Sequence, residues 1–286
     1  MQSLAISLGW PKLRRLALDA VKSDLPKFQT VKAIMSAYSS LGLVSRVLRD
    51  SPLFHGLETA VLDNMVVSLK PEHWPRHKLV MTPEDTLRYF YVLLKGRVKV
   101  TRQNPETGRE ITLFLLGPGD GFNVVSLLDG QRHEVTVETL DEVEALSAPL
   151  AQWLGWMEVY PAFHHAMHRY IDWRMQQLSE LASDLALYDT MTRLVHLILR
   201  YFDSNGEERH PRANLIKDLP HDELAHMIGT VRVVVNRLLS ELRQEGLVNT
   251  VDGELHVCNL EKLLLKAEQH VRIRKFLSNS VEQSQK

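Results

Sequence analysis

Near Pro161 the hydrophobic pattern of this chain changes from alternation to helical spacing. Upstream of that proline, between residues 79 and 148, apolar and polar residues alternate in short runs that turn signals such as Gly117-Pro118 separate. The runs are Tyr89–Val92, Val98–Val100, Ile111–Leu116, Val135–Val137 and Val143–Leu146. Strands of about five residues at this spacing favour a small antiparallel barrel or roll over a parallel sheet. The predicted fold class is therefore α+β, with the roll preceding a helical region.

Downstream of Pro161 the apolar residues recur at helical spacing. A stripe with steps of three and four residues runs through this region and is interrupted at Arg174. Its other members are Ile171, Leu178, Leu181, Leu185 and Tyr188. The stripe predicts a long helix over residues 161–189 that pairs with a second copy of the chain, and packing within the chain is the alternative. A second amphipathic helix is predicted around residues 191–199.

Three histidines lie near the predicted start of the long helix. His164, His165 and His168 form an HHxxH pattern, in which residues 164 and 168 share one helical face. Such a pair can bind zinc or haem, but the neighbouring sequence offers no obvious third ligand. We therefore favour a surface or helix-packing role for these histidines.

Residues 219–248 predict two helices joined by a tight turn. The apolar face of the first helix consists of Leu224, Ala225, Met227 and Ile228. Gly229 supplies the turn, and Thr230 is the predicted cap of the second helix. The second-helix residues that we expect to face the core are Val231, Val235, Leu238, Leu239 and Leu242.

The remaining faces of the second helix carry Arg232, Val233, Asn236 and Arg237. A glycine turn followed by a helix with arginines near its start is typical of a helix-turn-helix that reads DNA. Downstream, Asp252-Gly253 predicts a hairpin turn, and the hairpin would form a wing. A helical hairpin that serves packing alone is the alternative.

The charge balance of the whole chain gives no hint of a nucleic-acid partner. Its 286 residues include 34 Lys and Arg against 35 Asp and Glu, a formal net charge of −1. Residues 1–50, however, hold eight basic and three acidic residues, with apolar residues between them at roughly helical spacing. This pattern predicts a basic helical extension that packs on the body or the dimer, or else contacts DNA, an anionic membrane or a partner protein.

The single cysteine, Cys258, excludes whole classes of protein. One cysteine rules out an internal disulfide framework, a cysteine-based zinc site and a four-thiolate iron–sulfur cluster, and it suits a reducing cytosol. No apolar run approaches the roughly 18 residues that a membrane span requires. Nucleophile-elbow, phosphate-loop and HExxH patterns are also missing from the sequence, so we do not expect an enzyme.

The order of roll, long helix and winged helix-turn-helix resembles the cyclic-AMP receptor protein/fumarate–nitrate regulator superfamily of bacterial transcription factors. The matching segments are SPLF at 51–54, LLKGRVKV at 93–100, GREITLFLLGPGD at 108–120, LLDG at 127–130, LALYD at 185–189 and DELAHMIGTVRVVVNRLLSELRQEGLV at 222–248. The resemblance covers roughly residues 51–270. It implies an effector-type β-roll at 51–160, a dimerisation helix at 161–189 and a winged helix-turn-helix at 190–270. The basic helical extension predicted at 1–50 precedes these domains, and we expect a polar tail at 271–286.

The resemblance also implies which residues read DNA. An R-E-x-x-x-R pattern supplies base contacts in this family, and the matching positions here are Arg232, Val233 and Arg237, so both arginines are kept and the acid is lost. Thr230 and Asn236 complete the DNA-binding set that we expect. Arginine can bind guanine O6 and N7 together, whereas valine can only contact a thymine methyl. The half-site should therefore differ from that of the cyclic-AMP receptor, and the pattern is closer to the cyanobacterial global nitrogen regulators.

The effector pocket implied by the resemblance departs from the cyclic-nucleotide pattern. At the family's G-E and R-S positions this chain has Asn123 and Val124, and His133 and Glu134. Arg132 should point to the opposite face as a strand neighbour, and an unpaired Glu134 would repel a buried phosphate. We therefore do not expect control by cyclic AMP bound in the usual manner. The predicted pocket residues are Phe122, Asn123, Val124, Val125, Arg132, His133, Glu134 and Leu178.

Three interpretations of the effector stay open. The pocket binds another small molecule such as an organic acid, or haem with a histidine such as His77 or His133 as axial ligand, or the protein needs no ligand. The resemblance implies a cytoplasmic homodimer on near-palindromic double-stranded DNA, with RNA polymerase as a further partner. The second candidate function is a small-molecule or haem-binding sensor, or a protein-interaction module, whose helix-turn-helix is structural.

Overall fold

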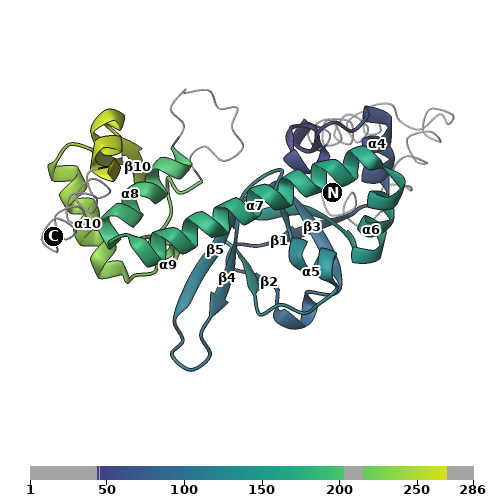
Figure 1. Cartoon of the computed structure of the whole chain (residues 1–286), viewed down its shortest axis with the longest axis horizontal. Helices are drawn as coiled ribbons and strands as arrows, with labels where there is room; N and C mark the ends of the chain where they lie inside the picture. The colour runs from purple at the N-terminus through teal and green to yellow at the C-terminus, as the bar shows by residue number, and fades with distance from the viewer. Residues whose placement is uncertain (1–43, 45, 203–214, 269–286) are drawn as a thin grey trace, which may run out of the picture. The chain divides into compact units, whose positions relative to one another are not determined.

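The structure, a computed structural model, describes residue 44, residues 46–202 and residues 215–268 (Figure 1). These form two compact units, one within residues 1–99 and 116–173 and the other within residues 100–115 and 174–286. Most of the predicted basic extension and all of the predicted tail at 271–286 lie outside the described residues. The domain boundaries expected from the resemblance stay a prediction.

Short strands form two four-stranded sheets, in the orders β1-β8-β3-β6 and β2-β7-β4-β5. Their bounds are β1 Lys70–Trp74, β2 Leu79–Met81, β3 Tyr89–Lys95, β4 Val98–Gln103, β5 Glu110–Leu116, β6 Gly121–Phe122, β7 Thr136–Thr139 and β8 Val143–Pro149. Buried and more exposed side chains alternate at the start of β3, as expected for a strand with one face in the core: Phe90 and Val92 are fully buried and Tyr89 is exposed. Antiparallel pairing joins β1 and β3 to β8 and β2 to β7, so the predicted antiparallel roll is confirmed.

Strand β1 is one that the apolar pattern did not predict. Its sequence, KPEHW, has no apolar alternation, and most of its residues are exposed or half-buried. Pro71 is compatible with a strand here because β1 lies at the edge of its sheet, where one side of the strand needs no partner.

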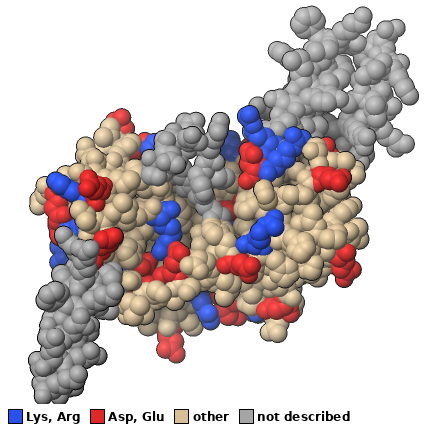
Figure 2. Space-filling model, turned by 45° about the horizontal axis from the view of Figure 1, so that its top comes forward, with Lys and Arg blue, Asp and Glu red and all other residues tan. Residues whose placement is uncertain are grey.

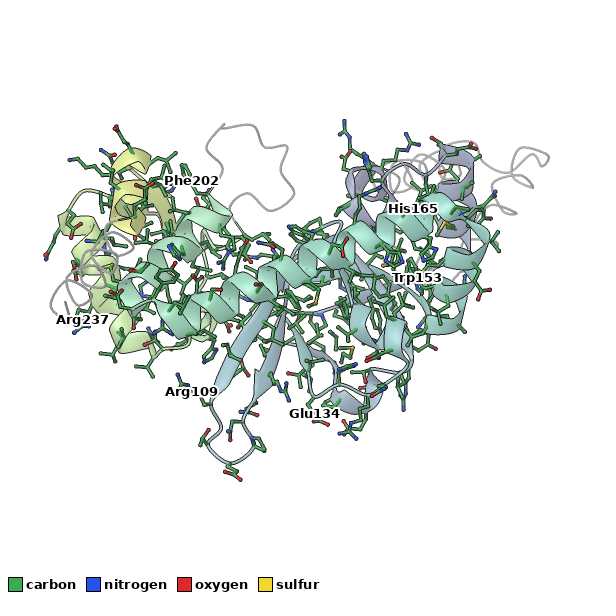
Figure 3. The ribbon with its side chains drawn as sticks, in the orientation of Figure 1. Arg109, Glu134, Trp153, His165, Phe202 and Arg237 are labelled. Carbon is green, nitrogen blue, oxygen red and sulfur yellow. The ribbon has the colours of Figure 1, made fainter. Side chains whose placement is uncertain are left out.

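Aromatic side chains fill the core of the first unit. Trp153 is fully buried, and its ring centroid lies 4.9 Å from that of Phe90 and 6.2 Å from that of Phe54 (Figure 3). The short helices that contribute to or border this core are η1 Pro52–Phe54, α4 Thr59–Val67, η2 Pro83–Asp85, α5 Val124–Asp129 and α6 Leu150–Val159. Aromatic pairs in these tilted arrangements stabilise a core beyond the area that they bury.

Helix α7, Pro161–Leu187, confirms the predicted long helix and has 27 residues. Proline suits its first position, where the missing N–H would have no partner in the helix. The buried face of its first half includes Phe163, Met167 and Tyr170. The Tyr170 hydroxyl accepts a hydrogen bond from the Gly121 amide at 3.0 Å and donates to the Gly121 carbonyl at 2.8 Å, which joins the helix to β6.

In the second unit, helix α8, Thr190–Tyr201, packs beside the end of α7, and it confirms the predicted amphipathic helix. Asp184 on α7 is buried and contacts His196 Nδ1 at 2.7 Å and an Arg200 guanidinium nitrogen at 2.9 Å. Burial by itself would raise the pKa of Asp184, but the hydrogen bonds and charges of His196 and Arg200 outweigh it and hold this pKa below its usual value. The carboxylate therefore stays charged and ties α7 to α8.

The remaining elements of the second unit are α9 His221–Ile228, α10 Arg232–Gln244, β9 Val248–Val251 and β10 Glu254–Val257. Strands β9 and β10 pair antiparallel, with Val251 opposite Glu254. Between them Asp252 and Gly253 have φ of 52° and 84°, the left-handed conformations of a tight hairpin turn. The predicted winged helix-turn-helix is confirmed.

Candidate nucleic-acid interface

Helix α10 has one buried face and one face open to solvent. Val235, Leu238, Leu239 and Leu242 are at most 5% exposed, and they fix the helix in its domain. The exposed face carries the residues predicted to contact DNA bases, Arg232, Val233, Asn236 and Arg237. Arg237 lies at the outer side of its domain (Figure 3). The structure therefore brings these four predicted side chains together on one accessible surface.

The turn before α10 differs in two details from the sequence-based expectation. Val231 is the residue that precedes α10 and caps it with extended backbone, and its side chain is 62% exposed rather than directed to the core. Thr230 is not the cap, and no side chain caps α10. The helix starts one residue later than predicted, so a residue assigned to the core stripe lies outside the helix.

Gly229 makes this turn because its backbone adopts φ 65°, in the left-handed region, directly after α9. A Cβ at this position would lie 2.7 Å from Leu185 Cδ2, so a larger residue would also collide with α7. The Thr230 amide then donates to the Ala225 carbonyl at 2.9 Å and closes the end of α9. The backbone conformation therefore favours glycine here, and any larger residue would also force Leu185 to shift.

Two side chains of α9 contact residues of α10 that are predicted to bind DNA. Arg232 forms an ion pair with Asp222 at 3.2 Å, and both groups are more than half exposed. Asn236 shares a short hydrogen bond with His221. These contacts hold the side chains of Arg232 and Asn236 in the structure. The sequence pattern does not point to Asp222 or His221, because only the packing of α9 against α10 brings them to Arg232 and Asn236.

The hairpin between β4 and β5 contributes two further contacts within the second unit. Arg109 donates to the Gly229 carbonyl at 2.9 Å, and Glu110 lies 3.4 Å from His226 Nδ1. Both contacts meet the end of α9 and the turn that leads into α10. The sequence carried no signal for them, since they join residues more than 100 positions apart.

The charges of the described surface are mixed. Figure 2 shows Lys and Arg side chains interspersed with Asp and Glu over the visible face.

The predicted effector residues 122–125 lie around the start of α5. Phe122 is buried and stacks on Tyr91, with ring centroids 4.6 Å apart. Asn123 has φ 75°, and its amide nitrogen donates to the carbonyls of Thr86 and Tyr89 at 2.6 and 2.7 Å. Val124 is half-buried, and Val125 is 52% exposed. Asn123 therefore supports the local backbone, and its amide nitrogen is committed to two carbonyls of the chain.

Residues 132–134 do not form the strand that we expected from the sequence. They lie before β7 and not in a strand, so strand alternation does not separate Arg132 from its neighbours. Arg132 pairs with Glu84 at 2.9 Å and with Glu134 at 3.3 Å. The expectation of an unpaired Glu134 was wrong, because its carboxylate is exposed and meets Arg132. Two carboxylates therefore already pair with the guanidinium of Arg132, which directly precedes His133 in the sequence.

His133 is held by the segment before it. Its Nε2 lies 2.8 Å from the Asp129 carboxylate, and its amide donates to the Thr86 hydroxyl at 3.4 Å. The hydrogen bond that the Gln131 amide donates to Asp129 is the main cause that lowers the pKa of Asp129. The hydrogen bond with the His133 side chain lowers this pKa further. His77, the other predicted haem ligand, has φ 59° and lies 3.5 Å from Glu138. Haem ligation by either histidine stays a prediction.

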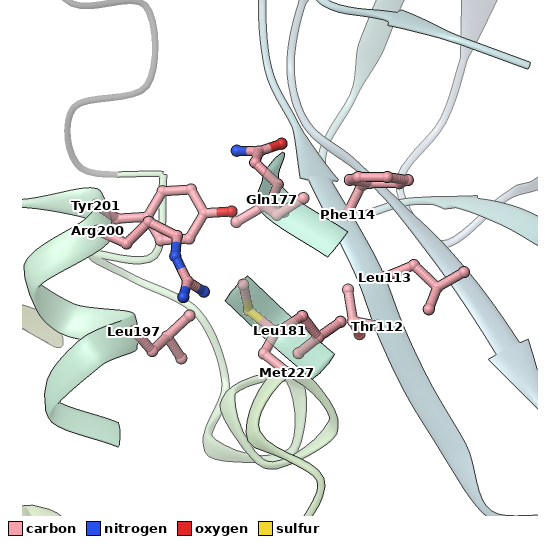
Figure 4. A pocket seen from close by; sticks show the side chains of 10 residues that line it. Thr112, Leu113, Phe114, Gln177, Leu181, Leu197, Arg200, Tyr201 and Met227 are labelled. Carbon is pink, nitrogen blue, oxygen red and sulfur yellow. The ribbon is translucent and has the colours of Figure 1, made fainter. Parts of the chain in front are cut away.

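A cavity of about 360 Å³, including its solvent-open part, lies in the second unit between β5, α7, α8 and α9 (Figure 4). Its lining residues are Thr112, Leu113, Phe114, Leu115, Gln177, Leu181, Leu197, Arg200, Tyr201 and Met227. The Thr112 hydroxyl is buried and has no hydrogen-bond partner in the described part of the chain. Arg200 is paired with Asp184 at 2.9 Å and Glu180 at 3.4 Å, so its charge is balanced. None of the predicted effector residues lines this cavity.

The residues predicted for the dimer helix differ in exposure. Leu181 is only 9% exposed and lines the cavity, whereas Ile171, Leu178, Leu185 and Tyr188 are half-buried. The interrupting Arg174 is buried, with its guanidinium 5.2 Å from the centre of the Phe114 ring. Pairing through these residues stays a prediction.

Two outward residues of α7 were not in the predicted stripe. Met175 is 59% exposed, and Ala182 is also exposed. The sequence did contain this signal, because steps of four and three residues from Ile171 lead through Met175, Leu178 and Ala182 to Leu185. The predicted stripe and this one share Ile171, Leu178 and Leu185, so periodicity alone does not distinguish between them.

Within residues 44, 46–202 and 215–268, no helix is long and apolar enough to cross a membrane. The same residues contain no group of three or more metal-ligating side chains.

Two family models match this chain. The model described as a cyclic nucleotide-binding domain matches residues 71–160, and the model described as a Crp-like helix-turn-helix domain matches residues 192–265. They coincide with the roll and with the winged helix-turn-helix, respectively.

Curated relatives and solved structures agree with these matches. The CRP-like cAMP-activated global transcriptional regulator of Mycobacterium tuberculosis is 24% identical over 78% of this chain and 100% of its own length. The global nitrogen regulator of Synechocystis is 32% identical over 66% of this chain and 84% of its own length. A structure of a CooA mutant from Carboxydothermus hydrogenoformans has a TM-score of 0.60 at 20% identity, covering 71% of this chain and 90% of that chain, and it shows the shared fold. The chain therefore belongs to the cyclic-AMP receptor protein/fumarate–nitrate regulator superfamily of transcription regulators.

Proposed function

We propose that this protein is a homodimeric regulator that binds a near-palindromic DNA sequence by placing α10 in the major groove. The observation that carries the proposal is the two-faced character of α10. Its leucines are buried, while Arg232, Val233, Asn236 and Arg237 are exposed together. Side chains near the start of a recognition helix are those that reach base edges in this kind of docking.

The chemistry of this surface supports a specific half-site. Arg232 and Arg237 can each bind guanine through O6 and N7, which discriminates against other bases by about 1–3 kcal/mol per contact. Val233 is 76% exposed and supplies a methyl surface that suits the thymine C5-methyl group. Thr230 lies in the turn and is suited to a phosphate or base contact. RNA polymerase as a partner and the cytoplasm as location belong to the same proposal.

The outward face of α7 supports the homodimer. Ile171, Met175, Leu178, Ala182 and Leu185 recur at steps of four and three residues, the spacing of a coiled-coil seam. None of the five is in the fully buried class, so each retains surface for a second chain. Two parallel copies of α7 would bring both helix-turn-helix domains to one DNA, where successive major grooves are about 34 Å apart.

We further propose that the effector is not cyclic AMP bound in the usual manner, or that none is needed. Arg132 is already paired with two carboxylates, and His133 with Asp129. A cyclic phosphate entering here would have to displace these pairs or share them with negative charge. The names of the relatives include cAMP-activated proteins and nitrogen regulators, so the family itself does not fix the effector.

Selection of bound sequences from random double-stranded DNA tests the proposal. The full chain should enrich a near-palindrome, and Arg232→Ala and Arg237→Ala should each abolish the preference at one position of each half-site, a loss of about 1–3 kcal/mol there. Arg243→Ala is the matched control, because this exposed arginine lies at the other end of α10 and its Nε donates to the Leu239 carbonyl. Enrichment of no sequence, or unchanged preferences in both variants, would favour a structural helix-turn-helix instead.

A further inference from the structure

We propose that His164 and His168, together with the same residues of a second chain, bind one divalent transition-metal ion such as Zn²⁺ at the N-terminal end of the dimer seam. The inference rests on the proposed homodimer and adds a site to it. Imidazole nitrogen is a preferred ligand of zinc, copper and nickel ions.

The two imidazoles are already arranged as neighbouring ligands. Both histidines are exposed on one face of α7, and their Nε2 atoms lie 2.8 Å apart. Two nitrogens bound at about 2.0–2.1 Å to one tetrahedral ion would be about 3.3 Å apart, so only a small change of side-chain angle is needed.

The register of α7 places both histidines on the seam. From Ile171 the steps of three and four residues continue back to His168 and then to His164. The order His164, His168, Ile171, Met175, Leu178 alternates d and a positions without interruption. In a parallel pair of helices each d residue meets its copy and each a residue meets its copy. Four imidazoles therefore converge over one turn of the seam.

One chain alone does not complete the site. The described residues include no group of three or more metal-ligating side chains, so the described part of one chain supplies two ligands here. A second chain raises the number to four, the usual coordination of structural zinc. Without an ion, four polar rings would occupy positions that favour apolar side chains, at a cost to dimer stability.

The neighbouring His165 provides an internal comparison. It is also exposed and lies beside His164 in sequence, but a turn of about 100° per residue takes it off the seam. The distance between the ring centroids of His164 and His165 is 6.4 Å, against 4.6 Å for His164 and His168. A site that needs only surface histidines would use all three alike.

Metal binding by the full chain, stripped with a chelator and titrated with Zn²⁺, tests the site. We expect one ion per two chains, loss of this binding in His164→Ala and in His168→Ala, and retention in His165→Ala. Co²⁺ in place of Zn²⁺ should give the visible absorption of a four-coordinate ion. Absence of binding, one ion per single chain, or equal loss in His165→Ala would overturn the shared site.

Sedimentation and DNA binding of the metal-free chain separate this site from the proposed function. A metal-free dimer that still binds DNA specifically but takes up no Zn²⁺ would overturn the metal site and leave the regulator intact. A chain that stays monomeric with and without Zn²⁺ would overturn both the site and the proposed dimer. Zinc-dependent strengthening of the dimer, lost in the two seam variants, would support the site.

Discussion

At the scale of single residues, the most consequential contact is the ion pair between Arg232 and Asp222. The arginine that we expect to bind a guanine is held at 3.2 Å by a carboxylate of the preceding helix. Both side chains are exposed, so the pair contributes little to folding. In the proposed docking its effect would fall on DNA binding, because Arg232 would have to exchange this partner for a base while Asp222 brought a negative charge toward the phosphates.

We therefore expect Asp222→Asn to strengthen DNA binding. An exposed pair of this kind is worth about 0.2–1 kcal/mol, which corresponds to an affinity increase of up to about fivefold, greatest at low salt. Titration of labelled DNA at two salt concentrations measures the change. Glu261→Gln, which removes an exposed carboxylate outside both helices of the motif, is the control. Equal or weaker binding by Asp222→Asn would show that the carboxylate positions Arg232 instead of competing for it.

At the scale of elements, the apolar pattern predicted what local periodicity encodes. The runs around Phe90, Leu115 and Leu146 are strands, and the leucines of residues 238–242 face the core, because burial of one face imposes a period on the sequence. Strand β1 escaped prediction because its residues are mostly polar and it needs only the edge of a sheet. The pairing of Arg132 with Glu84 escaped because two segments 48 positions apart meet there. Contacts of that kind are fixed by packing, not by spacing along the chain.

The turn between α9 and α10 offers a direct test at this scale. Gly229→Ala should destabilise the second unit for two reasons: the left-handed backbone costs a residue with a Cβ about 1–2 kcal/mol, and the new methyl would overlap Leu185. Gly246→Ala is the matched control, since Gly246 has φ 68° but a methyl group added there would meet no atom within 4 Å. Thermal or urea unfolding should show a larger loss for Gly229→Ala. Equal losses would mean that Leu185 moves aside and that backbone strain alone acts.

At the scale of the whole molecule, one face of α7 connects the proposed parts of the function. The same register that carries Met175 and Leu178 also carries the two histidines, and a side of the helix about a quarter turn away is used inside the chain by Tyr170 and Leu181. A helix that is committed on one face and apolar on the other is a natural place for a second copy. An effector can then act only through a difference in its affinity for two arrangements of the paired helices.

Met175→Lys tests whether this face holds the dimer together. Met175 is 59% exposed in the single chain, so the change should leave the fold intact while it places two like charges against each other at an a position. Sedimentation should then show a monomer at concentrations where the unchanged chain is a dimer. Specific DNA affinity should fall by about 10²–10⁴-fold, because the second half-site is no longer bound through a linked partner.

Gln176→Lys is the control that distinguishes disruption of the seam from a general effect of an added positive charge on α7. Gln176 is the next residue along α7 and is exposed, but it lies about 100° away from the stripe. Its variant should remain a dimer and bind DNA as the unchanged chain does. If Met175→Lys also stays dimeric, the pairing surface must use other residues, and the four-histidine site would lose its geometric basis at the same time. If both variants become monomers, charge near α7 and not the register of the seam controls assembly.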